Sequence, residues 1–365
     1  MKRLLLAIAL VTIALPLPLH ADPKPAARDD RTLTMMTRNL YLGASLSRPL
    51  AATTPGELVT AVTTTFAIVQ ATNFPERAGA LADEIAAAGP DLVGLQEVAL
   101  WRSQFPSDLS PIPNATTVEY DFLQLLLDAL DARGVHYAPV VILTTVDQEG
   151  PRLTPAGLQD IRFTDRDVIL VRVDHKGPNL KLSNIDGQSF TTNVVVPGIP
   201  GVTGPVVIRR GWVSVDVKAR GRTVRFISTH LITPDAPAVQ VAQAEELLAG
   251  PAATDLPVIM VGDFNSAADG SGTATYGKLI AGGFVDAWNV ARPGDPGLTC
   301  CQTETLRNPA STLSARIDLI LFRGDFDVEA IDVVGDNPAD RTPSGLWPSD
   351  HAGVTATLEV PRARR

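Results

Sequence analysis

The sequence predicts an α/β fold in which two mixed β-sheets pack face to face beneath outer helices, a four-layer α/β sandwich. Short apolar, β-branched segments alternate with amphipathic helical segments along the chain, the pattern typical of packed α and β layers. With 45% hydrophobic residues in 365, the chain can bury a large core. No Pro/Ser linker or charge block divides its middle, which favours one domain over two.

The N-terminus has the pattern of a secretory signal peptide. Met1-Lys2-Arg3 precede an apolar run, and Ala21 supplies the small residue at which we place cleavage. Pro16 and Pro18 interrupt that run before the ~20 residues that a membrane span requires, so no stable membrane anchor is expected. Export to a periplasm or to the outside of the cell follows. The predicted organisation is a signal peptide (1–21), a mobile N-terminal segment (22–31), one domain (32–360) and a basic C-terminal tail (361–365).

The net charge limits the partners. Loss of Lys2 and Arg3 with the signal peptide takes the formal charge from −9 to −11. Because Lys and Arg supply most of the non-specific affinity for nucleic acid, this acidity argues against a broad DNA-binding surface but is compatible with a local basic cleft.

The two cysteines of the chain, Cys300 and Cys301, are adjacent. Neighbouring Cα atoms lie about 3.8 Å apart, which is below the usual disulfide range. A strained vicinal disulfide and two buried thiols both remain open, and we assign neither cysteine a catalytic role.

The predicted elements follow in chain order. A strand over 33–40 precedes a Thr/Ala-rich stretch, which reaches Ala71 and receives no element, and a helix over 75–88 stops at Gly89-Pro90. A strand over 91–97 and a helix over 120–133 come next. The remaining expected elements are strands at 138–146, 168–173, 180–185, 211–217 and 223–230, a helix at 236–249, a strand from Val258, a short helix at 276–281, and strands at 317–322 and 354–358. We expect the apolar segment Val194–Val202 to form a loop or hairpin over the core, with an exposed substrate or interface contact as the alternative.

Polar residues end or follow several of these strands. The run from Val258 stops at Gly262-Asp263-Phe264-Asn265, where Asp263 and Asn265 are two residues apart and leave the same face of an extended chain. An Asx-type turn is the alternative explanation of this pair. The full set of such residues is Asn39, Glu97, His230, Asp263, Asn265, Asp318, Asp350 and His351.

These residue types suit phosphate chemistry. Glu97 and Asp350 are hard oxygen donors, which favour Mg²⁺, Mn²⁺ or Ca²⁺. An unperturbed histidine titrates near neutrality, so His351 could accept a proton from water, with Asp318 orienting its ring. The side chains that could donate hydrogen bonds to phosphate oxygens are those of His230, Asn39 and Asn265.

Six motifs in order carry a resemblance to a known family: Arg38-Asn39, Leu95-Gln96-Glu97, Ser228-Thr229-His230-Leu231, Gly262-Asp263-Phe264-Asn265, Arg316-Ile317-Asp318-Leu319-Ile320 and Ser349-Asp350-His351. Together they resemble the endonuclease/exonuclease/phosphatase superfamily, which includes DNase I and bacterial sphingomyelinases. The resemblance implies a DNase I-like fold, Glu97 as main metal ligand, Asp350 as a second metal contact, and a His351–Asp318 pair. It also implies phosphate contacts from His230, Asn39 and Asn265.

The resemblance leaves the general base open. Asp263 matches the position held to orient or deprotonate the attacking water, or to bind a second metal, and so competes with His351; we favour His351. Leu40 and Tyr41 stand where some abasic-site nucleases carry an extra metal-binding acid, so one ion is expected rather than two. Arg166 and Arg210 are the candidates for a phosphate contact from the middle of the chain. His136 and His175 match no motif and are expected to be structural.

The expected function is an exported, monomeric, metal-dependent phosphodiesterase of the nuclease type. Its substrate would be nucleic acid, a phospholipid headgroup or a small phosphodiester. Only 5% of residues are aromatic, which leaves few platforms for stacking bases. The alternatives are a sphingomyelinase-like lipid phosphodiesterase, a small phosphate-ester phosphatase and, more remotely, a catalytically silent binding domain.

Overall fold

The computed structural model describes residues 32–174, 180–199, 203–219 and 221–360. The predicted signal peptide (1–21), N-terminal segment (22–31) and C-terminal tail (361–365) lie outside the described residues, as does His175. Within these ranges, no helix is both long and apolar enough to cross a membrane.

One mixed sheet contains strands from both ends of the domain, in the order β15-β16-β1-β2-β6-β3-β4, with β5 paired to β6. β1 runs parallel to β2 and antiparallel to β16, because helices return the chain between β1 and β2. The strands are β1 (Thr32–Asn39), β2 (Leu92–Gln96), β3 (Leu100–Gln104), β4 (Thr117–Asp121), β5 (Tyr137–Thr154), β6 (Gly157–Arg172), β15 (Asp327–Val334) and β16 (Gly353–Glu359).

The second sheet has the order β13-β14-β12-β11-β10-β7. Its parallel pair is β11 and β12, which the helix α5 connects. The strands are β7 (Lys181–Ser189), β10 (Gly211–Ala219), β11 (Arg222–His230), β12 (Val258–Asp263), β13 (Val285–Asp286) and β14 (Asp318–Arg323). β8 (Val194–Val196) and β9 (Val206–Ile208) pair with each other apart from the two large sheets. β8 lies in the apolar segment predicted to form a loop or hairpin, whereas β9 lies beyond its predicted end.

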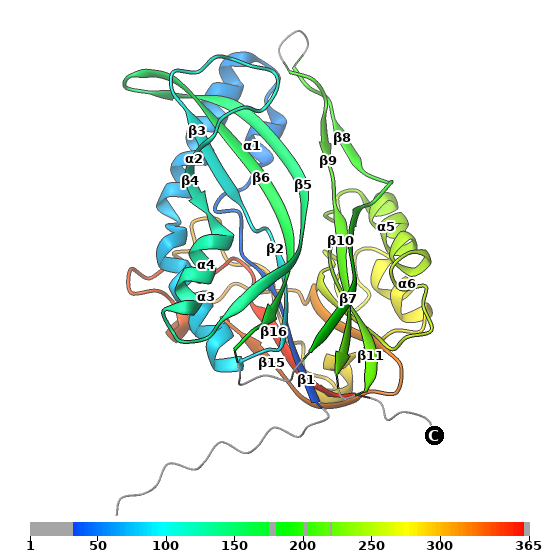
Figure 1. Cartoon of the computed structure of the whole chain (residues 1–365). Coiled ribbons are helices and arrows are strands. Elements are labelled where there is room, and N and C mark those ends of the chain that lie inside the picture. Colours follow the sequence, from blue (N-terminus) through cyan, green and yellow to red (C-terminus); the bar gives the residue numbers. More distant parts are fainter. Residues whose placement is uncertain (1–31, 175–179, 200–202, 220, 361–365) are drawn as a thin grey trace, which may run out of the picture. The chain divides into compact units, whose positions relative to one another are not determined.

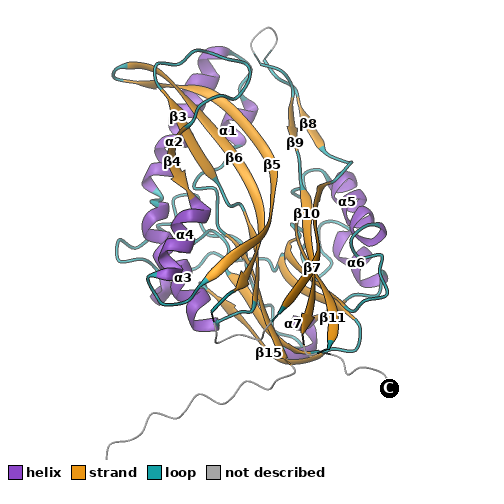
Figure 2. Ribbon diagram, viewed as in Figure 1, coloured by secondary structure: helices purple, strands orange, loops and turns teal. Residues whose placement is uncertain are grey.

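The two sheets pack against each other, and helices cover their outer faces (Figures 1 and 2). A buried cluster that includes Met35, Val215 and Ile259 fills the space between the sheets. At Gly94 a Cβ atom would lie 2.5 Å from the Ser228 hydroxyl, so a glycine is required where the sheets approach closely. The helices are α1 (Ser47–Ala51), α2 (Pro55–Ala71), α3 (Phe74–Ala88) and α4 (Phe122–Asp131) by the first sheet, α5 (Pro237–Ala249) and α6 (Thr275–Ala281) by the second, and α7 (Ala287–Ala291). The predicted four-layer sandwich is confirmed.

Several elements differ from those predicted. The stretch before Ala71 that received no element is the helix α2, which begins at a capping box formed by Thr54 and Glu57. The Thr-x-x-Glu signal for this helix is present in the sequence. β5 and β6 form one long hairpin, of which the predicted strands at 138–146 and 168–173 are only parts. β3, β4 and β15 were not predicted at all; β4 and β15 are edge strands with few buried residues, so their sequences lack a clear apolar alternation.

Candidate active site

Strand register brings three of the predicted residues side by side in the second sheet. His230 pairs with Asp263 across β11 and β12, and Asp263 pairs with Asp318 across β12 and β14. β11 and β12 are parallel and end at the same edge of the sheet, and the antiparallel β14 begins at that edge. Gly262, the residue before Asp263 in β12, has a φ of 151°. A Cβ atom at this position would collide with the Thr229 carbonyl group, so the residue must be glycine.

The first sheet supplies the remaining predicted residues to the same edge. Asn39 ends β1, Glu97 follows β2, and the Asp350-His351 pair lies just before β16. Glu97 has a φ of 57° and Asn265 a φ of 49°, a left-handed conformation that is uncommon for residues with a side chain. Such conformations cluster at functional sites, where the surrounding structure holds them.

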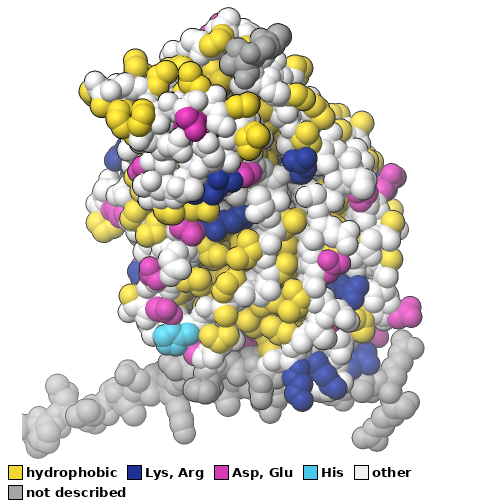
Figure 3. All heavy atoms as spheres, turned by 45° about the horizontal axis from the view of Figure 1, so that its top comes forward, with side chains coloured by type: hydrophobic (Ala, Val, Ile, Leu, Met, Phe, Trp, Pro, Cys, Tyr) yellow, Lys and Arg dark blue, Asp and Glu magenta, His cyan; other side chains and the backbone are white. Residues whose placement is uncertain are grey.

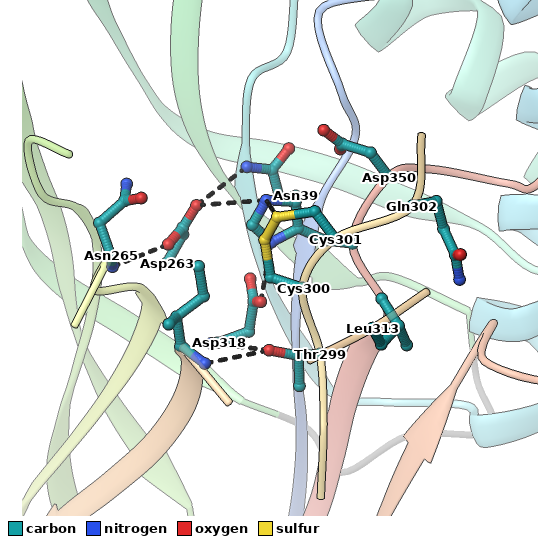
Figure 4. The surroundings of a disulfide bond; sticks show 12 residues. Asn39, Asp263, Asn265, Thr299, Cys300, Cys301, Gln302, Leu313, Asp318 and Asp350 are labelled. Atoms are coloured by element: carbon teal, nitrogen blue, oxygen red, sulfur yellow. Dashed lines mark hydrogen bonds and ion pairs between the residues drawn. A yellow bond between two sulfur atoms is a disulfide. The ribbon is translucent and has the colours of Figure 1, made fainter. Parts of the chain in front are cut away.

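The Asp263 carboxylate is the centre of the polar network (Figure 4). Its Oδ1 accepts a hydrogen bond from the Asn265 backbone N–H (2.9 Å), and its Oδ2 accepts one from the Asn39 amide (3.1 Å). The same Oδ2 lies 3.4 Å from His230 Nε2 and 3.8 Å from His351 Nε2. A separation of 3.8 Å is longer than a direct hydrogen bond, so an oxygen atom beside this pair can contact both the Asp263 carboxylate and the His351 ring.

The predicted pair of His351 and Asp318 is present. His351 Nδ1 lies 2.8 Å from Asp318 Oδ2, a distance that fixes the ring and leaves Nε2 directed toward Asp263. The backbone of His351 is held as well, because its carbonyl oxygen accepts a hydrogen bond from Arg38, whose guanidinium also pairs with Glu84 at 2.9 Å. The ring that faces the site is therefore positioned at both its side chain and its main chain.

The surroundings of the two histidines give them different protonation states. Burial disfavours the His351 imidazolium, but the neighbouring Asp318, Asp263 and Asp350 outweigh burial and hold the pKa of His351 well above its ordinary value. Burial and the nearby Arg210 cation hold the pKa of His230 well below its ordinary value. His351 is thus a cation at neutral pH and His230 is neutral.

The Asp263 carboxylate titrates close to neutrality. Burial raises its pKa to about 6, against the opposing influence of the positive His351 ring. A carboxylate with this pKa is ionised at pH 7 and is still basic enough to accept a proton.

Glu97 and Asp350 both line a cavity of about 800 Å³. Glu97 Oε2 accepts a hydrogen bond from the Leu42 backbone N–H at 2.8 Å, which leaves its other oxygen free for a ligand. Burial and the adjacent Asp350 carboxylate raise the pKa of Glu97 to about 8, and burial also raises that of Asp350. Two neighbouring acids that repel each other in this way are stabilised by a cation, so the pair fits a hard divalent ion.

A tighter cluster of possible ligand atoms lies beside this pair. One oxygen or nitrogen each from Asp263, Asp318 and His351 lie within 4.8 Å of one another. Glu97 and Asp350 do not belong to this cluster, so the assignment of these two as metal ligands stays a prediction. A cationic His351 would oppose a metal ion inside the cluster, which favours the Glu97 and Asp350 position.

The two candidate arginines have different surroundings. Arg166 donates to the Val98 carbonyl oxygen and pairs with Asp121 at 2.6 Å, which ties it to the wall of the fold. Arg210 lines the cavity with Glu97, and its Nη1 pairs with Asp165 at 3.0 Å. Arg210 is therefore the one of the two placed to contact a phosphate.

Arg77 was not among the predicted site residues. Its fully buried guanidinium donates to the carbonyl oxygens of Leu40, Tyr41 and Pro348, as well as to that of Thr72. These bonds connect the segment after β1 to the segment before Asp350-His351. The sequence did contain a signal for this role, because Arg77 lies on the buried face of α3. A charged side chain is rarely buried unless it has a specific partner.

The adjacent cysteines form a vicinal disulfide, one of the two predicted alternatives. Cys301 Sγ lies 4.0 Å from His351 Nε2, so the disulfide packs beside the site (Figure 4). His136 is exposed and pairs with Asp131 at 2.7 Å, and the structural role predicted for it stays a prediction.

The model of the endonuclease/exonuclease/phosphatase family matches residues 69–351. Among curated proteins, none matches the sequence significantly.

Solved structures share the fold at low sequence identity. An endonuclease/exonuclease/phosphatase family protein from Leptotrichia buccalis C-1013-b superposes with a TM-score of 0.54 at 16% identity, covering 89% of this chain and 98% of its own. A mannosyl-6-phosphatase from Bacteroides thetaiotaomicron VPI-5482 gives 0.53 at 19% identity, with 89% and 99% covered. Truncated Caenorhabditis elegans TDP2 gives 0.51 at 18% identity, with 90% and 98% covered. These likenesses confirm the predicted DNase I-like fold.

Proposed function

The chain belongs to the endonuclease/exonuclease/phosphatase family and is a phosphoric ester hydrolase; from this premise we propose that it cleaves phosphodiesters by direct attack of water. The observation that carries the proposal is the placement of Asp263. Its carboxylate lies 3.4 Å from the His230 ring and 3.8 Å from the ring of His351, the residue that follows Asp350. This placement supports one shared site for the proposed base, the proposed phosphate-binding groups and the proposed metal ligands.

Glu97 and Asp350 would hold one divalent cation, with Mg²⁺ as the first candidate and Mn²⁺ or Ca²⁺ as alternatives. When bound, such an ion polarises a phosphate oxygen and neutralises charge that develops on the leaving group. The proposal of a single ion is supported by Leu40 and Tyr41, which follow Asn39 where a further acid would be needed.

We assign the general base to Asp263, although the sequence pattern alone favours His351. The reason is electrostatic, because an imidazole that already carries a proton at pH 7 cannot accept another from water. Asp263, with a pKa of about 6, is ionised at that pH. Its Oδ2 accepts the proton as the water oxygen attacks phosphorus.

The other residues stabilise the phosphate. The His351 cation, oriented by Asp318, directs its Nε2–H toward the Asp263 side of the site, where the phosphate oxygens gain negative charge. His230 and Asn39 are neutral donors beside the same carboxylate. Arg210 adds a cation at the wall of the cavity. Asn265 acts mainly as a support, since its side-chain amide donates to the Leu231 carbonyl oxygen at 2.9 Å.

We further propose that the protein is exported through the N-terminal signal sequence and acts as a monomer in a periplasm or outside the cell. The charged start, apolar run and Ala21 cleavage position support export. Protease mapping of the mature N-terminus after expression tests the cleavage position; an N-terminus at Met1 in the mature protein contradicts it.

A substrate panel tests the proposed activity. The purified protein is assayed with Mg²⁺, Mn²⁺ and Ca²⁺ against DNA, RNA, sphingomyelin, phosphoinositides and bis-p-nitrophenyl phosphate, with p-nitrophenyl phosphate as the monoester. Metal-dependent hydrolysis of a diester in preference to the monoester is expected. Preference for the monoester supports a phosphatase instead, and no hydrolysis with any ion supports a binding domain.

A further inference from the structure

Glu97 and Asp350 line a cavity whose wall is mostly apolar. Its volume of about 800 Å³ falls within the range of ~300–1,000 Å³ that holds ligands of drug size. Half-buried aliphatic side chains approach it from two directions, from α1 and α2 and from the β8–β9 hairpin. They include Leu50, Leu58, Val62, Val194, Val196 and Ile208.

The charges around this cavity do not suit a polyanion. Of the described residues that line it, Arg210 is the one Lys or Arg, whereas the lining acids are Glu97, Glu149, Asp165, Asp235, Glu304 and Asp350. A nucleic-acid strand carries a phosphate at every nucleotide and is bound largely through Lys and Arg. On the face that Figure 3 shows, Lys and Arg side chains are scattered among hydrophobic ones and form no continuous patch. A ligand with one phosphate and an uncharged apolar body fits these walls better.

We infer that the substrate is a lipid phosphodiester, bound with an aliphatic chain along the apolar walls and with its phosphate beside Glu97, Asp350 and Arg210, which line the same cavity. This inference rests on the proposed phosphodiesterase function and names its substrate class. A lipid is the expected occupant because the apolar walls and the predicted metal ligands line one and the same cavity. In the reaction, water adds to phosphorus and one P–O ester bond breaks, which gives a phosphate monoester and an alcohol.

A homologous series of substrates measures the contribution of the apolar walls. Methyl, butyl and octyl p-nitrophenyl phosphodiesters share one leaving group and differ in the alkyl chain alone. Each methylene that leaves water for an apolar wall should raise kcat/KM by about two- to fourfold, so octyl should exceed methyl by ~10²-fold or more. The assays are run with Mg²⁺ and below the concentration at which the octyl ester forms micelles.

A pair of neighbouring variants places the effect in the cavity. Val196→Glu puts a carboxylate into the apolar wall, and it should lower kcat/KM for the octyl ester at least ~10-fold while the methyl ester changes less than about twofold. Val195→Glu is the matched control, because Val195 lies in the same strand but is 56% exposed and does not line the cavity. It should leave both esters unchanged.

The outcomes separate the two proposals. Hydrolysis of the methyl ester without dependence on chain length, or equal effects of Val195→Glu and Val196→Glu, would overturn the lipid assignment and leave the phosphodiesterase intact. Cleavage of single-stranded DNA faster than the octyl ester, unaffected by Val196→Glu, would overturn it in favour of a nuclease. Failure to hydrolyse any diester would refute the proposed function and the inference together.

Discussion

The assignment of Asp263 as general base makes a specific prediction about pH. The pKa of Asp263 is raised to about 6, so the carboxylate is ionised above this pH and protonated below it. Hydrolysis should therefore be lost as the pH falls. At pH 5 about one-tenth of the molecules keep the ionised form, and kcat/KM should be about one-tenth of its plateau, with a slope of one below that.

Two substitutions test which group produces this acid limb. Asp263→Asn removes the base and should lower kcat/KM by ~10² to 10⁴-fold, with the acid limb abolished. His351→Ala should lower the rate but retain the limb, displaced to higher pH, because the His351 cation lowers the pKa of Asp263. Asp269→Asn, the same change at an exposed aspartate six residues along the chain, is the control and should keep the wild-type profile.

The assay must keep the cation bound across the pH range. Without a cation the pKa of Glu97 is raised to about 8, so protons compete with Mg²⁺ for this carboxylate as the pH falls. At each pH the rate is therefore measured at a Mg²⁺ concentration that can be doubled without changing the rate. The assignment of Asp263 is refuted if the acid limb survives in Asp263→Asn and disappears in His351→Ala.

Three further predictions follow from the contacts of the site. His230→Ala should lower kcat by ~10² to 10³-fold with little change in KM, since a neutral donor to developing phosphate charge is lost; an effect on KM alone would contradict this role. Arg77→Ala leaves four buried carbonyl oxygens without their donor, and urea unfolding should show a loss of ~3–5 kcal/mol, with Arg77→Lys intermediate; a loss below ~1 kcal/mol would refute the structural role. Calorimetric titration with Mn²⁺ should find one binding site per chain, whose affinity Asp350→Asn lowers. A second site of similar affinity would show that the assignment of a single ion is wrong.

The positions of the site residues could be predicted because each is tied to a strand end. An apolar run that stops at a polar residue shows where a strand leaves the core, and the ends of parallel strands such as β11 and β12 meet at one edge. Because His230 and Asp263 end such apolar runs, the sequence indicated that both lie at this edge. Their register, with His230 opposite Asp263, required the structure.

Other features depend on contacts between distant segments. The charge of His351 is set by three carboxylates, those of Asp263, Asp318 and Asp350, whose separation from the ring no sequence spacing specifies. This is why residue type alone favoured His351 as the base. The apolar cavity likewise combines α2 with the β8–β9 hairpin, more than a hundred residues apart in sequence. Its walls became recognisable only in the folded chain.

The central claim is that acids at this edge hold a divalent cation required for phosphodiester hydrolysis. Its most direct test is the hydrolysis of bis-p-nitrophenyl phosphate by the wild-type protein and by Glu97→Gln, first in EDTA and then with increasing Mg²⁺. We predict no activity in EDTA, full recovery of the wild type with Mg²⁺, and a rate for Glu97→Gln that stays far below the wild type at every Mg²⁺ concentration. Full wild-type activity in EDTA, or a Glu97→Gln variant with unchanged Mg²⁺ dependence, would contradict the claim.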